Sequence, residues 1–125
     1  GLYQIRKLKP DTEIFHETAR RVLGANISDP GYLRQQATIY RDYCKRIGDE
    51  NMIPLEARVR MVGNLSKLGE TKEADKLASQ IEKQGERHPL LARSLVLLSQ
   101  AMQNTNQGRS NHLRMLAARL SDESA

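Results

Sequence analysis

The stretch KLGETKEADKLASQIEKQG, residues 67–85, contains a glycine where the surrounding residues would otherwise favour one continuous helix. Glycine inside a helix costs about 1 kcal/mol relative to alanine, so Gly69 is better explained as a helix end than as an interior residue. Four apolar residues then recur at helical spacing before Gly85, namely Ala74, Leu77, Ala78 and Ile81. The stretch therefore predicts a tight turn at Gly69, followed by a second helix that ends near Gly85.

The amino-acid composition favours a helical core. The chain has 125 residues, of which 38% are hydrophobic and only 4% aromatic, and it contains no tryptophan. A core made of Leu, Ile, Val, Met and Ala suits close helix packing better than a sheet, which favours β-branched and aromatic residues. We therefore predict an all-α fold.

Start and stop signals divide the chain into six predicted helices. Asp11 and Asp29 are candidate N-caps, and Gly24 and Gly48 end the first two helices. The second helix carries an apolar stripe of Leu33, Ala37, Tyr40, Cys44 and Ile47. The remaining helices are predicted over 54–69, from there to residue 85, from Pro89, and after NTNQGRSN (104–111), where Leu113, Leu116, Ala117 and Leu120 are expected to be buried.

These helices predict one domain over residues 11–121. Residues 1–10, GLYQIRKLKP, are interpreted as a basic arm or linker, with the flank of a membrane helix in a longer parent protein as the alternative. Residues 122–125 are interpreted as a frayed polar tail.

An internal repeat links the second half of the chain to the stretch around Gly69. The motif PLEAR at 54–58 returns as PLLAR at 89–93, 35 residues later. Beyond it the matching shift becomes 39 residues, which pairs Gly69 with Gly108 and Leu77 with Leu116. The pattern predicts a helix pair that is repeated once, with four extra residues in its second turn.

The segment LGETKEA (68–74) resembles the turn of a tetratricopeptide repeat, in which Gly-acid-x-x-Glu-Ala joins two helices. The resemblance is strongest over 55–85. Two features of the family differ here, because Arg58 or Val59 replaces its large aromatic residue and its closing proline is displaced to Pro89. The resemblance implies an α-α superhelix of antiparallel helical hairpins, and a plain six-helix bundle is the structural alternative.

No pattern typical of catalysis or metal binding occurs in the sequence. The histidines, His16, His88 and His112, lack a ligand partner at i+3 or i+4. Cys44 is the only cysteine, and its place on an apolar stripe favours an inert thiol in a reducing compartment. We therefore expect no metal, no cofactor and no enzymatic activity.

The resemblance implies a groove lined by the first helix of each pair. The repeat alignment places eight residues there: Glu56, Val59, Gly63, Ser66, Leu91, Ser94, Leu98 and Ala101. Such a groove would accept a peptide or an amphipathic helix. The sequence thus predicts a non-enzymatic protein-interaction module or scaffold, located in the cytoplasm and part of a larger, bacterial-type protein.

Two alternatives follow from other features of the sequence. The net charge of +5 and a group of residues on the second helix would suit nucleic acid, and that group comprises Arg34, Arg41, Lys45 and Arg46 with Tyr40 and Tyr43. A self-associating structural domain is the other alternative, with Leu91 and Leu98 in the core or covered by a second copy of the chain in a homodimer. A membrane would be reached only through a segment outside this chain.

Overall fold

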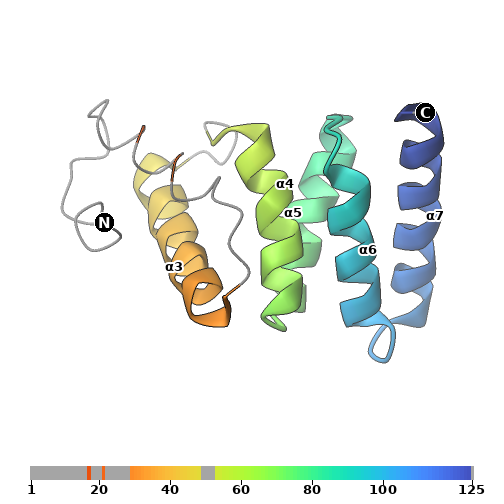
Figure 1. Ribbon diagram of the computed structural model, residues 1–125, viewed down its shortest axis with the longest axis horizontal. Coiled ribbons are helices and arrows are strands. Elements are labelled where there is room, and N and C mark those ends of the chain that lie inside the picture. Colours follow the sequence, from red (N-terminus) through yellow and green to blue (C-terminus); the bar gives the residue numbers. More distant parts are fainter. Residues whose placement is uncertain (1–16, 18–20, 22–28, 49–52, 125) are drawn as a thin grey trace. The chain divides into compact units, whose positions relative to one another are not determined.

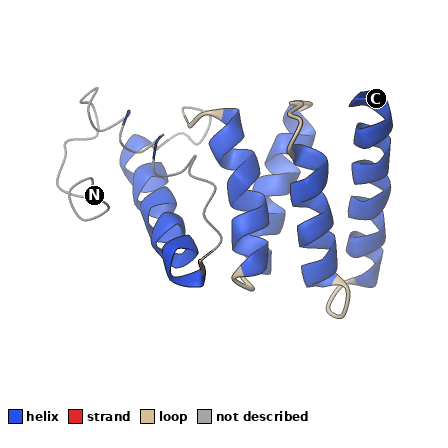
Figure 2. Ribbon diagram, in the orientation of Figure 1, coloured by secondary structure: helices blue, strands red, loops and turns tan. Residues whose placement is uncertain are grey.

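The structure, a computed structural model, describes residues 17, 21, 29–48 and 53–124. Five helices and no strand occur within these ranges, which confirms the prediction of an all-α fold (Figure 2). The arm over 1–10 and nearly all of the first predicted helix lie outside them. The chain divides into two compact units, 1–57 and 58–125, and the single domain over 11–121 stays a prediction.

The first unit contains helix α3, Pro30–Ile47, which begins and ends as the sequence predicts. The backbone N–H of Tyr32 donates to Asp29 Oδ2 at 3.0 Å, and Gly48 closes the helix in the left-handed conformation. The buried face is wider than the predicted stripe and comprises Leu33, Gln36, Ala37, Ile39, Tyr40 and Tyr43. Cys44 and Ile47 are only half-buried, so the centre of that face is rotated toward Gln36 and Tyr43.

The second unit contains most of α4 (Leu55–Lys67), together with α5 (Thr71–Gln84), α6 (Leu91–Met102) and α7 (Gln107–Ser124). Successive helices run in opposite directions (Figure 1). Helix α6 packs along α7, and α5 packs against α6. The buried hydrophobic residues of this unit include no aromatic residue, as the composition predicts, and Val59, Met61, Ile81, Leu98 and Leu113 are fully buried.

The turn at Gly69 forms as predicted. Gly69 has φ of +81°, in the left-handed region that favours glycine. Its N–H donates to the Ser66 carbonyl at 3.1 Å, and the N–H of Glu70 donates to the Leu65 carbonyl at 2.9 Å. These two bonds form a Schellman motif, which satisfies the last carbonyls of α4 and allows α5 to begin at Thr71.

The predicted equivalence of Gly69 and Gly108 is wrong. Gly108 lies in the first turn of α7, and the turn before it ends at Asn106, whose Oδ1 accepts from the N–H of Arg109 at 3.0 Å. An asparagine cap thus starts α7 without a left-handed glycine. Helix α6 begins at residue 91, 36 residues after α4 begins at residue 55, and α7 begins at residue 107, 36 residues after α5 begins at residue 71. One constant shift therefore replaces the predicted four-residue insertion.

Helix α7 continues to Ser124, beyond the predicted end of the domain at residue 121. Near its end, Glu123 forms an exposed ion pair with Arg87 at 3.4 Å. Of the residues predicted to be buried on this helix, Leu113, Ala117 and Leu120 are buried and Leu116 is half-buried.

We expect Gly69→Ala to lower the free energy of unfolding by about 1–2 kcal/mol, because alanine is strained in the left-handed conformation. Gly108→Ala is expected to be neutral or to stabilise by up to about 1 kcal/mol, since the position is helical. A Cβ at residue 108 would also lie 3.9 Å from its nearest neighbour, Asn106 Oδ1. Urea denaturation followed by circular dichroism measures both changes. Equal losses in the two variants would contradict this account and restore the equivalence of the two glycines.

Candidate functional site

The eight residues predicted to line a groove do not form an open surface. Six of them, Val59, Gly63, Ser66, Leu91, Ser94 and Leu98, are buried. Ala101 is half-buried, and Glu56 is exposed in the other unit of the chain. In this conformation the six buried residues offer no surface to a ligand, so their role in binding a partner stays a prediction.

Close packing of α4 on α6 explains part of this burial. A Cβ at Gly63 would lie 3.0 Å from Leu97 Cδ1 and 3.4 Å from Ser94 Oγ. The sequence predicts that Gly63 and Ser94 face a common ligand, but they lie against each other. The absence of a side chain at Gly63 lets the two helices approach closely, and their contact occupies this part of the predicted groove.

A buried arginine joins α4 to the segment that follows α5. Arg58 Nη1 donates to Glu86 Oε1 at 2.8 Å and Nη2 donates to Oε2 at 3.1 Å, while the Arg58 side chain is only 6% exposed. These hydrogen bonds lower the pKa of Glu86 below its ordinary value of 4.5; partial burial opposes the shift, and the attraction of the Arg58 charge adds to it. The pair holds the α4–α5 hairpin closed at the end opposite Gly69.

A second group of charges joins α5 to α7. Arg109 Nε donates to Asp75 Oδ1 at 2.8 Å, and its guanidinium also contacts Ser79 at 3.1 Å and Glu82 at 3.7 Å. His112 Nε2 lies 3.0 Å from Glu82 Oε2. Acidic groups on α5 thus meet basic groups on α7 across this contact.

Buried hydroxyls link α6 to α7. Ser99 Oγ donates to the Ser110 carbonyl at 3.0 Å, and Ser110 Oγ donates to the Ser99 carbonyl at 2.8 Å. Arg114 Nε donates to Ser99 Oγ at 3.1 Å. Within the described residues, every buried side-chain nitrogen or oxygen has a hydrogen-bond partner, so this interface is fully satisfied.

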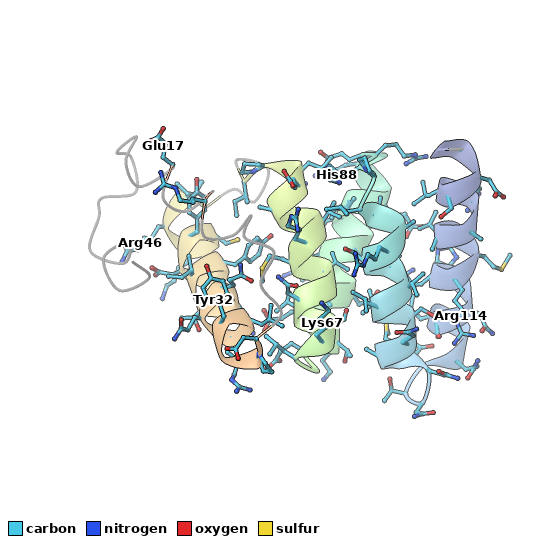
Figure 3. All side chains as sticks on the ribbon, in the orientation of Figure 1. Glu17, Tyr32, Arg46, Lys67, His88 and Arg114 are labelled. Carbon is cyan, nitrogen blue, oxygen red and sulfur yellow. The ribbon has the colours of Figure 1, made fainter. Side chains whose placement is uncertain are left out.

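An open groove lies on the surface of α6 and α7. It has a volume of about 450 Å³ and is lined by Pro89, Ala92, Arg93, Val96, Arg114, Ala117, Ala118 and Ser121. Most of these side chains are small, and Val96 is 39% exposed, one of two large hydrophobic residues exposed among those described. Small residues let another backbone approach closely. Figure 3 labels Arg114 on α7 and His88 in the loop before α6.

Two positions of this groove correspond to positions of α5 that lie beside α6. Ala78 and Glu82 of α5 lie beside Leu91 and Leu95 of α6 around a small pocket. The positions 36 residues after Ala78 and Glu82 are Arg114 and Ala118, and both line the groove. At these two positions the last described hairpin exposes Arg114 and Ala118, whereas the previous hairpin has α6 and α7 beside Ala78 and Glu82.

The sequence contains one signal for this groove. Helix α6 has more apolar residues than a single buried face requires, and Val96 is the one that falls outside that face. The sequence does not reveal the α7 residues of the groove, because the predicted shift of 39 residues is wrong. That alignment matches Ala78 with Ala117, whereas the observed shift of 36 residues matches it with Arg114.

The other sequence-predicted groups do not line the groove. Tyr40 and Tyr43 are buried, so their rings are not available to stack on bases, although Arg34, Arg41, Lys45 and Arg46 are exposed. His88 Nδ1 accepts from the Leu90 N–H at 3.1 Å, which gives it a local role before α6.

His16 is outside the described residues. Across the part of the chain that the structure describes, no cluster of His, Cys, Asp or Glu has the arrangement of a metal site. No helix in those same ranges has the length and apolar character needed to cross a membrane.

Comparison with known proteins finds no matching family model, no matching curated protein and no matching solved structure.

Proposed function

We propose that this chain is a non-enzymatic interaction module, and that the groove between α6 and α7 binds a helix of another protein. The observation that carries the proposal is the equivalence of this groove with the surface of α5 that holds α6. Because α6 places Leu91 and Leu95 against that surface, a partner helix with two leucines at i and i+4 would fit the groove in the same way. The single cysteine, Cys44, accords with a cytoplasmic location.

The chemistry of the groove supports this proposal. Ala92, Ala117 and Ala118 leave room for the side chains of a neighbouring helix, and the exposed side chain of Val96 provides an apolar contact. Helices pack at interaxial distances of about 8–10 Å, and the shorter of these distances require small residues at the contact. An alanine-lined groove flanked by two helices meets that requirement.

A displayed library of helical peptides tests the proposal. Each peptide would be about four helical turns long, with leucine at i and i+4 and the other positions randomised. We expect the chain to enrich binders whose affinity falls tenfold or more in Ala118→Phe, because a bulky ring at this exposed position fills the groove. Gln100→Phe is the matched control, since Gln100 is exposed on α6 and does not line the groove.

Three outcomes would overturn the proposed function. The first is failure to enrich any binder on the wild-type chain, and the second is undiminished binding by Ala118→Phe. The third is a wild-type dimer in sedimentation that Ala118→Phe dissociates, because the groove would then be occupied by a second copy of the chain.

A further inference from the structure

We propose that the helix bound by the α6–α7 groove is acidic, with carboxylates on both sides of its leucine pair. This inference rests on the proposed function and adds the chemical class of the partner. It follows from the charges around the groove, which differ from those at the equivalent contact inside the unit.

The residues lining the groove include two cations and no anion. Arg93 on α6 and Arg114 on α7 are both exposed, and the lining contains neither aspartate nor glutamate. Among the described residues, neither arginine forms an ion pair, and Arg114 uses only its Nε to bond Ser99. The acidic residues at the end of α7, Asp122 and Glu123, are not part of the lining, and Glu123 pairs with Arg87. The groove therefore carries two positive charges that a partner would neutralise.

Inside the unit, the contact of α5 with α7 has carboxylates on the earlier helix. There α5 contributes the carboxylates Asp75 and Glu82, and the next helix pair contributes Arg109 and His112. At the groove, position 118 has an alanine where α5 has Glu82, and position 114 has an arginine where α5 has Ala78. A helix that docks here therefore lies beside Arg93 and Arg114 and meets no counterpart of the Glu82 carboxylate, so carboxylates on the partner complement the site.

Arginine suits this role because its guanidinium can bind a carboxylate through two parallel hydrogen bonds. The two arginines come from different helices, so together they select a partner with acidic residues on both edges of its apolar face. Because both arginines are exposed, replacing them should change the choice of partner and the association rate more than the stability of the folded chain.

The sequences of the enriched peptides test the inference. On the wild-type chain we expect aspartate and glutamate to be enriched beside the leucine pair. The double variant Arg93→Glu/Arg114→Glu should lose tenfold or more affinity for these peptides and should instead enrich lysine and arginine. Arg119→Glu is the control with the same charge change per site, because Arg119 is exposed on α7 but does not line the groove. Arg93→Glu alone gives a second readout that leaves the Arg114–Ser99 bond intact.

The outcomes separate the two proposals. Peptides that bind, are blocked by Ala118→Phe and show no acidic preference would overturn this inference and leave the proposed function standing. Equal weakening of binding by Arg119→Glu and Arg93→Glu would likewise overturn the inference alone, because the charge effect would not be specific to the groove. If the wild-type chain enriches no peptide, the proposed function itself fails, and this inference fails with it.

Discussion

Leu98→Glu is expected to abolish cooperative folding of residues 58–125 at neutral pH. Leu98 is fully buried on α6, so the substitution removes a packed leucine and places a carboxylate in the hydrophobic core. Such changes cost more than about 4 kcal/mol, which is comparable to the whole stability of a small domain, about 5–15 kcal/mol. Leu98→Ala, which creates only a cavity, is expected to cost about 2–5 kcal/mol.

Val96→Glu is the matched control for Leu98→Glu. Val96 lies two residues away on the same helix and is 39% exposed, so its glutamate variant should change stability by less than about 1 kcal/mol. Thermal and urea unfolding followed by circular dichroism compare the two variants. If Leu98→Glu unfolded cooperatively with wild-type stability, Leu98 would have to be accessible in solution. The self-association hypothesis, which places this residue at a contact between chains, would then regain support.

Glu86→Ala is expected to destabilise the second unit by about 2–4 kcal/mol, because it leaves the Arg58 guanidinium buried without its carboxylate. The exposed Arg87–Glu123 pair provides the control, since its side chains are 59% and 51% exposed. Glu123→Ala should change stability by less than about 1 kcal/mol. Arg58→Met should cost less than Glu86→Ala, because methionine can be buried without an unpaired charge and Glu86, which is 28% exposed, can be hydrated.

The Arg58–Glu86 pair also makes stability depend on pH in a defined direction. Arg58 lowers the pKa of Glu86 below 4.5 in the folded state, so folding favours the ionised carboxylate. The resulting stabilisation is fully present above the ordinary pKa of 4.5 and is lost as the pH falls through the lower, folded-state pKa. Urea denaturation at a series of pH values should therefore show the difference between wild type and Glu86→Ala shrinking below pH 4.5. A difference that stays constant down to strongly acidic pH would contradict this account.

Local signals predict the helices well because helix ends are determined by a few neighbouring residues. Asp29 and Pro30 start α3, and the glycines at 48, 69 and 85 end three helices in the left-handed conformation. Only glycine adopts that conformation freely, so its position after an apolar stripe is a strong signal.

Spatial relations between helices are predicted less well. Gly108, like Gly69, lies between two apolar stripes in the sequence, which is why the repeat alignment matches the two. In the structure Asn106 caps α7, so Gly108 is already in the first turn of the helix. The sequence around a glycine does not show whether it ends one helix or belongs to the first turn of the next. The predicted groove residues are mostly buried in this conformation for a related reason. A sequence alignment shows which residues share one face of a helix. Whether that face is accessible to a ligand depends on how closely α6 packs on α4, and at Gly63 the two helices are in contact.

The groove between α6 and α7 can be recognised only once the constant shift of 36 residues is known. Arg93 and Arg114 are far apart in the sequence, and nothing in the local pattern distinguishes them from the other exposed cations. Their proximity depends on how α7 lies along α6, which is a property of the packed hairpin.

The hydroxyl pair of Ser99 and Ser110 fixes the axial register of α7 on α6. An interface made only of leucine and alanine would let one helix slide past the other by a turn with little loss of buried apolar surface. The two serines oppose that slippage, because moving apart would leave both hydroxyls buried and unbonded, at about 1–3 kcal/mol each. Since Arg114 and Ala118 follow on the same helix, this small polar contact also sets where the α7 side of the groove lies against α6.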